Sequence, residues 1–248
     1  MRALEIDGNL AEAHASLAKM KEDFEWNWAG AEKEFRRAIE LNSNYPTTHH
    51  WYSLFLSDMK RSDEALNESR LALKLDPLSP IISNLLGWTL LAAGNYDSAI
   101  EQLKRTLELE PTLPESHFLL SKAYWKKGLY PEAISEAQKA ASYSGRTLRF
   151  VAGVGYALAA AGKRAEAHNI IDELARSSKN GNVSPSYIAG IYGTLGEREQ
   201  AFAWLEKAYQ ARDDELTYIM IDPIFGSIRP DPRYTDLLRR MGLPQKGQ

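Results

Sequence analysis

Histidine is the residue type in this chain that could bind a metal ion or carry protons near neutral pH. Three of the five histidines, His14, His49 and His117, stand at equivalent positions near the starts of predicted helices. A zinc site requires three or four ligands that converge, and only one or two can be assembled around any of these side chains. We therefore predict partly buried histidines that pack between helices, and no bound metal.

Paired carboxylates could perform acid–base chemistry, but the acidic residues of this chain form no such pattern. Glu32, Glu34, Glu64 and Glu132 lie among lysines and arginines at helical spacing, which is typical of a solvated helix face. The chain has no cysteine, and it carries no glycine-rich phosphate loop and no nucleophile motif. The sequence therefore predicts a protein that is not an enzyme and that needs no cofactor.

Any functional site would be positioned by helices, and the sequence pattern of these helices recurs every 34 residues along the chain. One column of this repeat is alanine, at Ala31, Ala65, Ala99, Ala133, Ala167 and Ala201. A second column, twelve residues before the last five alanines, is small: Ser53, Gly87, Ser121, Gly155 and Ala189. A fixed period of this length predicts an array of helix–turn–helix units.

Each unit has the pattern of two helices that cross over small side chains. Pro46, Pro80 and Pro114 mark the starts of first helices, where the N–H that proline lacks would have no partner in any case. Two helices approach to about 8 Å only where the side chains at the crossing are small. We therefore expect the alanine column and the small column to face each other within each pair.

This pattern resembles the tetratricopeptide repeat (TPR), whose consensus combines small residues, glycine, alanine and proline at fixed places. The match covers residues 3–215, which is most of the chain. The resemblance implies an all-α, right-handed superhelix of about six units. One extra residue within residues 23–28 predicts an atypical first inter-helix turn, and the units that begin near Leu148 and Asn182 lack the closing proline.

The repeat register divides the chain into three parts. Residues 1–9, which include Ala3–Asp7, match the end of a second helix, so we expect a truncated preceding repeat and a longer parent protein. Six units are predicted at about 10–45, 46–79, 80–113, 114–147, 148–181 and 182–215. Residues 216–248 form a capping segment in which Asp222 and Asp231 each precede a proline and start a helix. The second of these helices should cover the last unit, as solenoids require.

In TPR arrays the first helices line a concave groove, so the resemblance implies which residues face a ligand. The predicted peptide-binding set is His50, Asn84, Trp88, Leu91, Phe118, Lys122, Trp125, Lys126, Arg149 and Tyr156. The aromatic members would anchor a peptide, and the cations would attract an acidic side chain or a terminal carboxylate. The alternative is that Trp88 and Trp125 only fill the space between units.

The function that these features predict is a non-catalytic module that binds a peptide or a helix of a partner protein. The closing segment is similar to those of TPR segments in large bacterial regulators, which implies a sensing or docking role in signalling. No unit has the lysine and asparagine of the carboxylate clamp found in chaperone-binding TPRs. The alternative function is self-assembly into a homo-oligomer, in which the open repeat end at Ala3–Asp7 stacks on another copy.

Composition limits the partners and the location of the protein. The formal net charge of −3 gives no basic stripe for direct binding of nucleic acid. No stretch approaches the ~18 consecutive apolar residues of a membrane span. We expect a cytoplasmic protein, with the periplasm left open, because a chain without cysteine suits either compartment.

Overall fold

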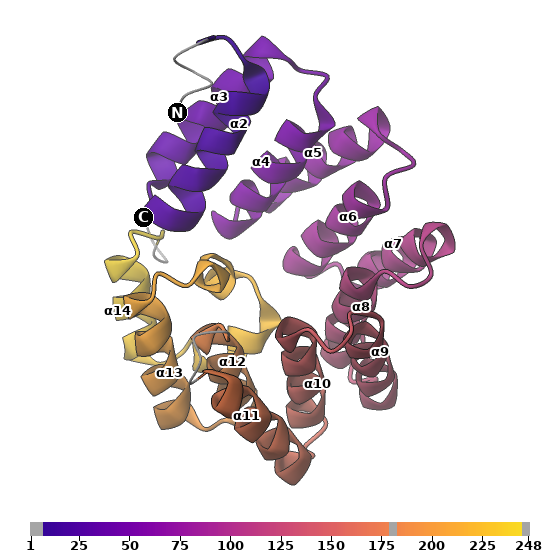
Figure 1. Ribbon diagram of the computed structural model, residues 1–248, viewed down its shortest axis with the longest axis vertical. Helices are drawn as coiled ribbons and strands as arrows, with labels where there is room; N and C mark the ends of the chain where they lie inside the picture. The colour runs from indigo at the N-terminus through magenta and orange to yellow at the C-terminus, as the bar shows by residue number, and fades with distance from the viewer. Residues whose placement is uncertain (1–6, 179–182, 245–248) are drawn as a thin grey trace.

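The chain is an array of helix pairs that curves into a closed arc (Figure 1). The computed structural model describes residues 7–178 and 183–244. Every regular element within these residues is helical. The architecture confirms the predicted all-α solenoid of stacked helix pairs.

The helix pairs follow one another without interruption along the chain. The first helices of the pairs are α2 (Ala11–Met20), α4 (Pro46–Asp58), α6 (Pro80–Ala92), α8 (Pro114–Lys126), α10 (Leu148–Ala160) and α12 (Pro185–Leu195). The second helices are α3 (Trp28–Leu41), α5 (Ser62–Leu75), α7 (Tyr96–Leu109), α9 (Tyr130–Tyr143), α11 (Arg164–Ser178) and α13 (Arg198–Gln210). Short 3₁₀ helices η2 (Asp214–Met220) and η3 (Pro223–Ile228) and the helix α14 (Pro232–Arg240) complete the structure.

Local sequence accounts for the helix boundaries. Helices α4, α6 and α8 begin at Pro46, Pro80 and Pro114, as the proline column predicted. Four turns between paired helices contain a glycine with φ between +75° and +82°, at Gly94, Gly128, Gly162 and Gly196. Only glycine adopts this left-handed conformation without strain, so this column ends the first helix and sets the direction of the second.

The two small columns form the contact between the helices of each pair. All six alanines of the 34-residue column are fully buried. A Cβ atom placed on Gly87 would lie 2.5 Å from Cδ2 of Leu103, which is fully buried on the partner helix. Such a distance is far inside van der Waals contact, so the column must stay small for the pair to close.

The first inter-helix turn is atypical, as the extra residue in this region predicted. Helix α2 continues into a π-helical turn, η1 (Lys21–Glu25), and Trp26 follows in the left-handed conformation with φ of +52°. A π-turn absorbs one additional residue within a helix. It also turns the side chain of Glu22 into the interior, where it is fully buried.

The C-terminal segment fills much of the concave side. In Figure 1 it lies inside the arc, and its helix η3 packs against α12. Six apolar side chains of this segment are almost completely buried: Leu216, Ile219, Met220, Ile224, Phe225 and Ile228. Sequence analysis predicted only a cap over the last unit. Helix α14 does contact that unit, through Arg240 on Glu206 of α13, but η2 and η3 belong to the core.

The two ends of the array contact each other. The indole Nε1 of Trp28 in α3 donates a hydrogen bond of 2.9 Å to the carbonyl oxygen of Met241, which follows α14. The guanidinium carbon of Arg212 lies 4.3 Å from the ring centre of Trp26. The arc is therefore closed within one chain. The predicted open end at Ala3–Asp7 lies outside the described residues, except for Asp7.

The crossing of α6 and α7 gives the first testable prediction. Gly87→Leu should lower the free energy of unfolding by roughly 1–3 kcal/mol, because the new side chain overpacks against Leu103. Gly226→Leu is the matched control, since a Cβ atom at Gly226 would meet nothing within 4 Å. Urea unfolding followed by circular dichroism measures both variants. Equal stability of the two variants would contradict the proposed crossing.

Candidate functional site

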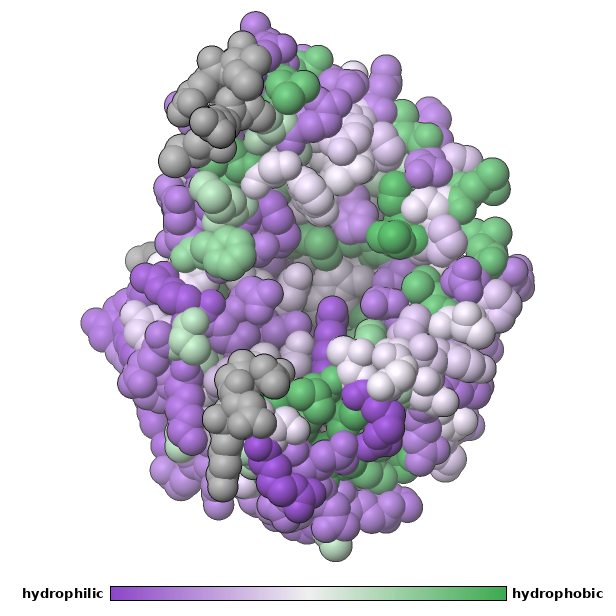
Figure 2. All heavy atoms as spheres, in the orientation of Figure 1, coloured by the Kyte–Doolittle hydropathy of each residue, from purple (hydrophilic) through white to green (hydrophobic). Residues whose placement is uncertain are grey.

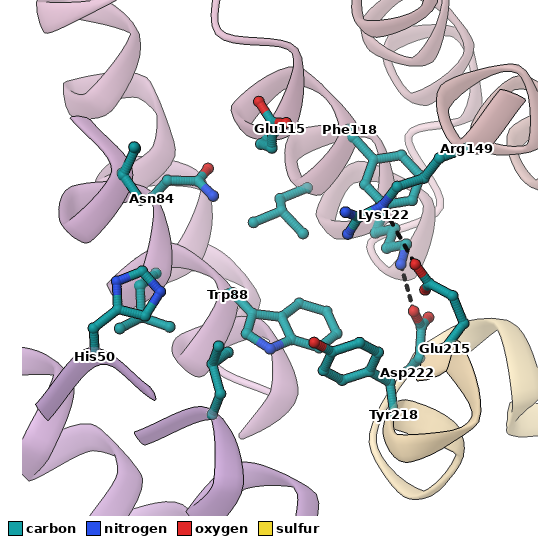
Figure 3. A pocket seen from close by; sticks show the side chains of 14 residues that line it. His50, Asn84, Trp88, Glu115, Phe118, Lys122, Arg149, Glu215, Tyr218 and Asp222 are labelled. Atoms are coloured by element: carbon teal, nitrogen blue, oxygen red, sulfur yellow. Dashed lines mark hydrogen bonds and ion pairs between the residues drawn. The ribbon is translucent and has the colours of Figure 1, made fainter. Parts of the chain in front are cut away.

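A pocket opens on the concave side, between the first helices and the C-terminal segment. Its volume is about 220 Å³, and the face that contains it is hollowed at its centre (Figure 2). Its lining consists of His50, Leu54, Ile81, Asn84, Leu85, Trp88, Glu115, Phe118, Leu119, Lys122, Arg149, Glu215, Tyr218 and Asp222. These residues come from α4, α6, α8 and α10, together with η2 and the residue before η3 (Figure 3).

The structure brings six of the ten predicted groove residues to this pocket. They are His50, Asn84, Trp88, Phe118, Lys122 and Arg149. Leu91 and Tyr156 are buried in the core instead. Trp125 lies against η3 in a separate small recess, and the ammonium of Lys126 lies 5.9 Å from the ring of Tyr96. These four residues therefore do not line the pocket.

The predicted aromatic anchors already have a partner within the chain. The rings of Trp88 and Tyr218 meet edge to face, with centres 5.9 Å apart, and Phe118 contacts Phe150 at 5.6 Å in the same manner. Only 8% of Trp88 and 4% of Phe118 is exposed. These rings form the floor of the pocket and expose little surface to an external peptide. Their role as peptide anchors stays a prediction, as does the alternative that Trp88 only fills space between units.

Lys122 is likewise engaged by the chain itself. Its ammonium lies 2.5 Å from Oδ2 of Asp222 and 4.3 Å from the ring centre of Phe118. Both members of the ion pair are almost completely buried. The charge of this ammonium is already balanced by the carboxylate of Asp222. Lys122 is therefore part of the framework of the pocket.

Arg149 is the cation that remains available. Its side chain is 42% exposed, and its Nε lies 3.9 Å from Oε1 of Glu215, beyond hydrogen-bond distance. The guanidinium is held over the rings of Phe118 and Phe150, at 5.6 and 5.9 Å, and it makes no hydrogen bond to any described residue. Glu215 accepts a hydrogen bond of 3.1 Å from the hydroxyl of Tyr187, and burial raises the pKa of its carboxyl group.

Asn84 and His50 face the pocket from the opposite side (Figure 3). The hydroxyl of Ser116 donates to Oδ1 of Asn84 at 2.8 Å, so the amide nitrogen is left to face the pocket, and it has no acceptor among the described residues. Burial, aided by the nearby Lys19, lowers the pKa of His50 to about 4. His50 is therefore neutral at pH 7. Ile81, which is 64% exposed, adds an apolar edge to the rim.

Comparisons with known proteins agree with the repeat pattern and the helix pairs. A tetratricopeptide repeat family model matches residues 56–114 and 84–146, and a second matches residues 188–215. The chain is a tetratricopeptide repeat solenoid. A comparison with curated protein sequences gave no significant match.

Several solved structures share this TPR fold. PilF of Pseudomonas aeruginosa is 26% identical, covers 70% of this chain and 79% of its own, and has a TM-score of 0.54. PilW, a type IV pilus biogenesis factor, is 16% identical, covers 88% of this chain and 97% of its own, and has a TM-score of 0.60. A MamA fragment from Desulfovibrio magneticus RS-1 is 16% identical, covers 68% and 96%, and has a TM-score of 0.52.

The histidine column has a structural role in this TPR chain. The ring Nδ1 atoms of His14, His49 and His117 lie 2.7, 2.5 and 2.5 Å from the carboxylates of Glu34, Glu68 and Glu136. Each Nε2 contacts the carbonyl oxygen six residues earlier, at Gly8, Ser43 and Pro111. These bonds join the two helices of a pair. Across the described part of the chain, no three acidic or histidine side chains are grouped as a metal site.

The three pocket residues that the C-terminal segment supplies escaped sequence analysis: Glu215, Tyr218 and Asp222. The pair Asp222-Pro223 was recognised as a helix start, and the Asp222 carboxylate does accept from the N–H of Ile224 at 3.1 Å. Nothing in the repeat pattern indicated that this turn folds back onto α8. Separately, no described helix is long and apolar enough to cross a membrane.

The ion pair under the pocket gives a second prediction. Lys122→Met should lower the free energy of unfolding by about 3–5 kcal/mol, because it leaves Asp222 buried and charged without a partner. Adding Asp222→Asn should recover part of this loss, since the amide is neutral and still accepts from the N–H of Ile224. Urea unfolding of both single variants and the double variant measures the coupling. Additive losses would show that the two residues do not act as a pair.

Proposed function

We propose that this TPR chain is a non-catalytic scaffold that binds a short segment of a partner protein across the mouth of the pocket. The observation that carries the proposal is the convergence of four successive first helices and the C-terminal segment on one opening. Donor groups of Arg149 and Asn84 lie on opposite sides of this opening and donate no hydrogen bond to described residues, although Arg149 is ion-paired with Glu215 at 3.9 Å. An apolar floor with a few convergent polar groups is the common composition of a binding site.

The size of the pocket favours a short contact over a long groove. Its volume of about 220 Å³ is below the roughly 300–1,000 Å³ that is usual for pockets that enclose a small molecule. Helices η2 and η3 occupy much of the rest of the concave side (Figure 1). The pocket therefore suits one or two side chains of a partner, while the remainder of the partner lies over the rim.

The charges of the rim define the chemistry of the segment. A guanidinium that rests on aromatic rings and makes no hydrogen bond is prepared for a two-point bond with a carboxylate. Asn84 can donate to a backbone carbonyl, and Ile81 offers apolar contact. Glu115 lies on the same lining and repels acids. The favoured partner segment thus places an acidic side chain or a terminal carboxylate at Arg149, and a neutral or basic residue near Glu115.

The biological setting remains a prediction. At 16% identity the likeness to PilW and MamA concerns the fold alone, and pilus biogenesis is the role of PilW. The regulatory role and the cytoplasmic location suggested by the sequence also stay predictions. What supports the scaffold proposal is the pocket, together with the general use of TPR arrays to bind proteins.

Self-assembly through the repeat ends remains the alternative. The contacts of Trp28 with Met241 and of Trp26 with Arg212 join α3 and η1 to the C-terminal part of the same chain. Stacking of a second copy on these surfaces would first require them to separate. This closure favours the pocket over the ends as the binding surface.

The scaffold proposal is tested by selection of a displayed peptide library on the full chain, followed by calorimetric titration of the enriched peptides. Enriched peptides should carry an acidic residue, and Asn84→Ala/Arg149→Ala should weaken their binding at least about tenfold, or roughly 1.4 kcal/mol.

Arg105→Ala is the matched control, because Arg105 lies on the outer helix α7, where its one partner among the described residues is Glu101 in an exposed ion pair. This variant should bind like the wild type. Equal binding by the double variant, or a library that yields no ligand, would count against the pocket as the binding site.

A further inference from the structure

Two carboxyl groups are buried together where the first and last parts of the chain meet. Glu22 belongs to the π-turn η1 and Asp58 ends helix α4, and both side chains are fully buried. None of their four oxygens accepts a hydrogen bond of ordinary geometry from a described residue, and the Lys19 ammonium approaches Oε2 of Glu22 only as an ion pair. With a proton on one acid, the two side chains can form a hydrogen bond to each other.

The surrounding charges do not balance the pair. Lys19 is the neighbouring cation, and its ammonium lies 3.3 Å from Oε2 of Glu22 and 2.8 Å from Oδ1 of Asp23. One positive charge thus faces three carboxyl groups, and Asp23 takes the shorter contact. Two adjacent anions in a buried site repel each other strongly, so a retained proton is the simplest way to remove the excess charge.

The described groups that the other packed elements bring towards the pair are a phenol, a neutral imidazole and a carboxylate that is already paired. Helix η2 contributes the hydroxyl of Tyr218, and Tyr218 interacts electrostatically with Lys19, Asp58 and Glu22. From α4, His50 is neutral at pH 7, since its pKa is lowered to about 4. From α3, Glu34 reaches η1 but is bound to Lys21 at 2.7 Å.

The pKa values of the pair agree with this geometry. Burial raises the pKa of Glu22 to about 7, against the opposing attraction of Lys19. Burial also raises the pKa of Asp58 well above its ordinary value, and the charge of Glu22 adds to the effect. At neutral pH the folded chain therefore holds a proton at this junction that the unfolded chain would release.

The junction connects the pair to the pocket. Both η1 and α4 pack against η2, and η2 supplies Glu215 and Tyr218 to the pocket lining. Helix α4 supplies His50 and Leu54 and ends at Asp58. A change in the charge of Glu22 or Asp58 therefore acts on the packing of η2 against η1 and α4. This packing holds one wall of the pocket and helps to close the arc.

We propose that Glu22 and Asp58 form a proton-held latch, which joins the first units to the C-terminal segment and loosens as the pH rises through neutral. The latch does not depend on the scaffold function. If the pocket does bind a partner, the latch would in addition make that binding depend on pH.

The direction of the pH effect follows from the linkage between proton binding and folding. The pKa of Glu22 rises from 4.5 to about 7 on folding, so the folded state binds more protons between these values. The stabilisation is fully present below pH 4.5, declines as the pH rises, and is lost above about 7. For this shift, the equilibrium constant for opening the junction should increase about tenfold between pH 6 and pH 8.

Hydrogen–deuterium exchange of the full chain at pH 6 and pH 8, corrected for intrinsic exchange, tests the latch. The amides of Ile221 and Asp222, which both donate to the carbonyl oxygen of Tyr218, should lose protection about tenfold at pH 8, while those of α8 change little. Glu22→Gln and Asp58→Asn should each weaken this pH dependence, and the double variant should remove it, because burial still raises the pKa of the acid that each single variant retains. Glu101→Gln, an exposed carboxylate on α7, should retain it.

Infrared spectroscopy provides a second measurement that needs no stable variant. The wild-type chain should show the band of a protonated carboxyl group at pH 6, well above the ordinary pKa of Asp and Glu, and the band should diminish by pH 8. The Glu101→Gln variant should show the same band. Absence of the band at pH 6, or a loss of protection spread equally over all helices, would overturn the proposal.

Discussion

Burial of the C-terminal segment on the concave face is the constraint on which the rest of this structure depends. Six apolar side chains of η2 and η3 are at most 6% exposed. At about 1.5–3 kcal/mol each, their burial is of order 10 kcal/mol, which is comparable to the whole stability of a typical domain. A peptide of micromolar affinity binds with only about 8 kcal/mol. The C-terminal segment is thus a permanent part of the core. The surface open to a ligand is the part of the concave face that this segment does not cover.

Closure of the arc follows from the same constraint. A TPR solenoid ordinarily gains stability from contacts between neighbouring units, but here η2 contacts α4 and η1, more than 150 residues earlier in the chain. Trp28 and Met241 add a hydrogen bond across 213 residues. Such contacts couple the two ends of the array. The chain should therefore lose its first and last units together, where an open solenoid could fray from either end.

Sequence analysis succeeded where the physics is local to one or two units. The crossing at Gly87, the helix start at Pro80 and the cap at Asp231 each depend on neighbouring residues. It failed where contacts join distant segments. Lys122 has the correct position for a groove cation, yet its partner Asp222 is 100 residues away and bears no repeat signal. The extra residue near Trp26 predicted an unusual turn, but no pattern indicated that this turn buries an acid.

The buried acid pair is the consequence of one local event. The π-turn that absorbs the extra residue directs Glu22 inward, where Asp58 already ends α4. Apolar side chains of similar volume would hold such a junction at least as well, and without dependence on pH. With two acids, the junction is strong only while it keeps a proton, so it is the part of the closed arc that opens first as protons are withdrawn. Because η2 belongs both to this junction and to the pocket, any partner that contacts Glu215 or Tyr218 must respond to the same proton.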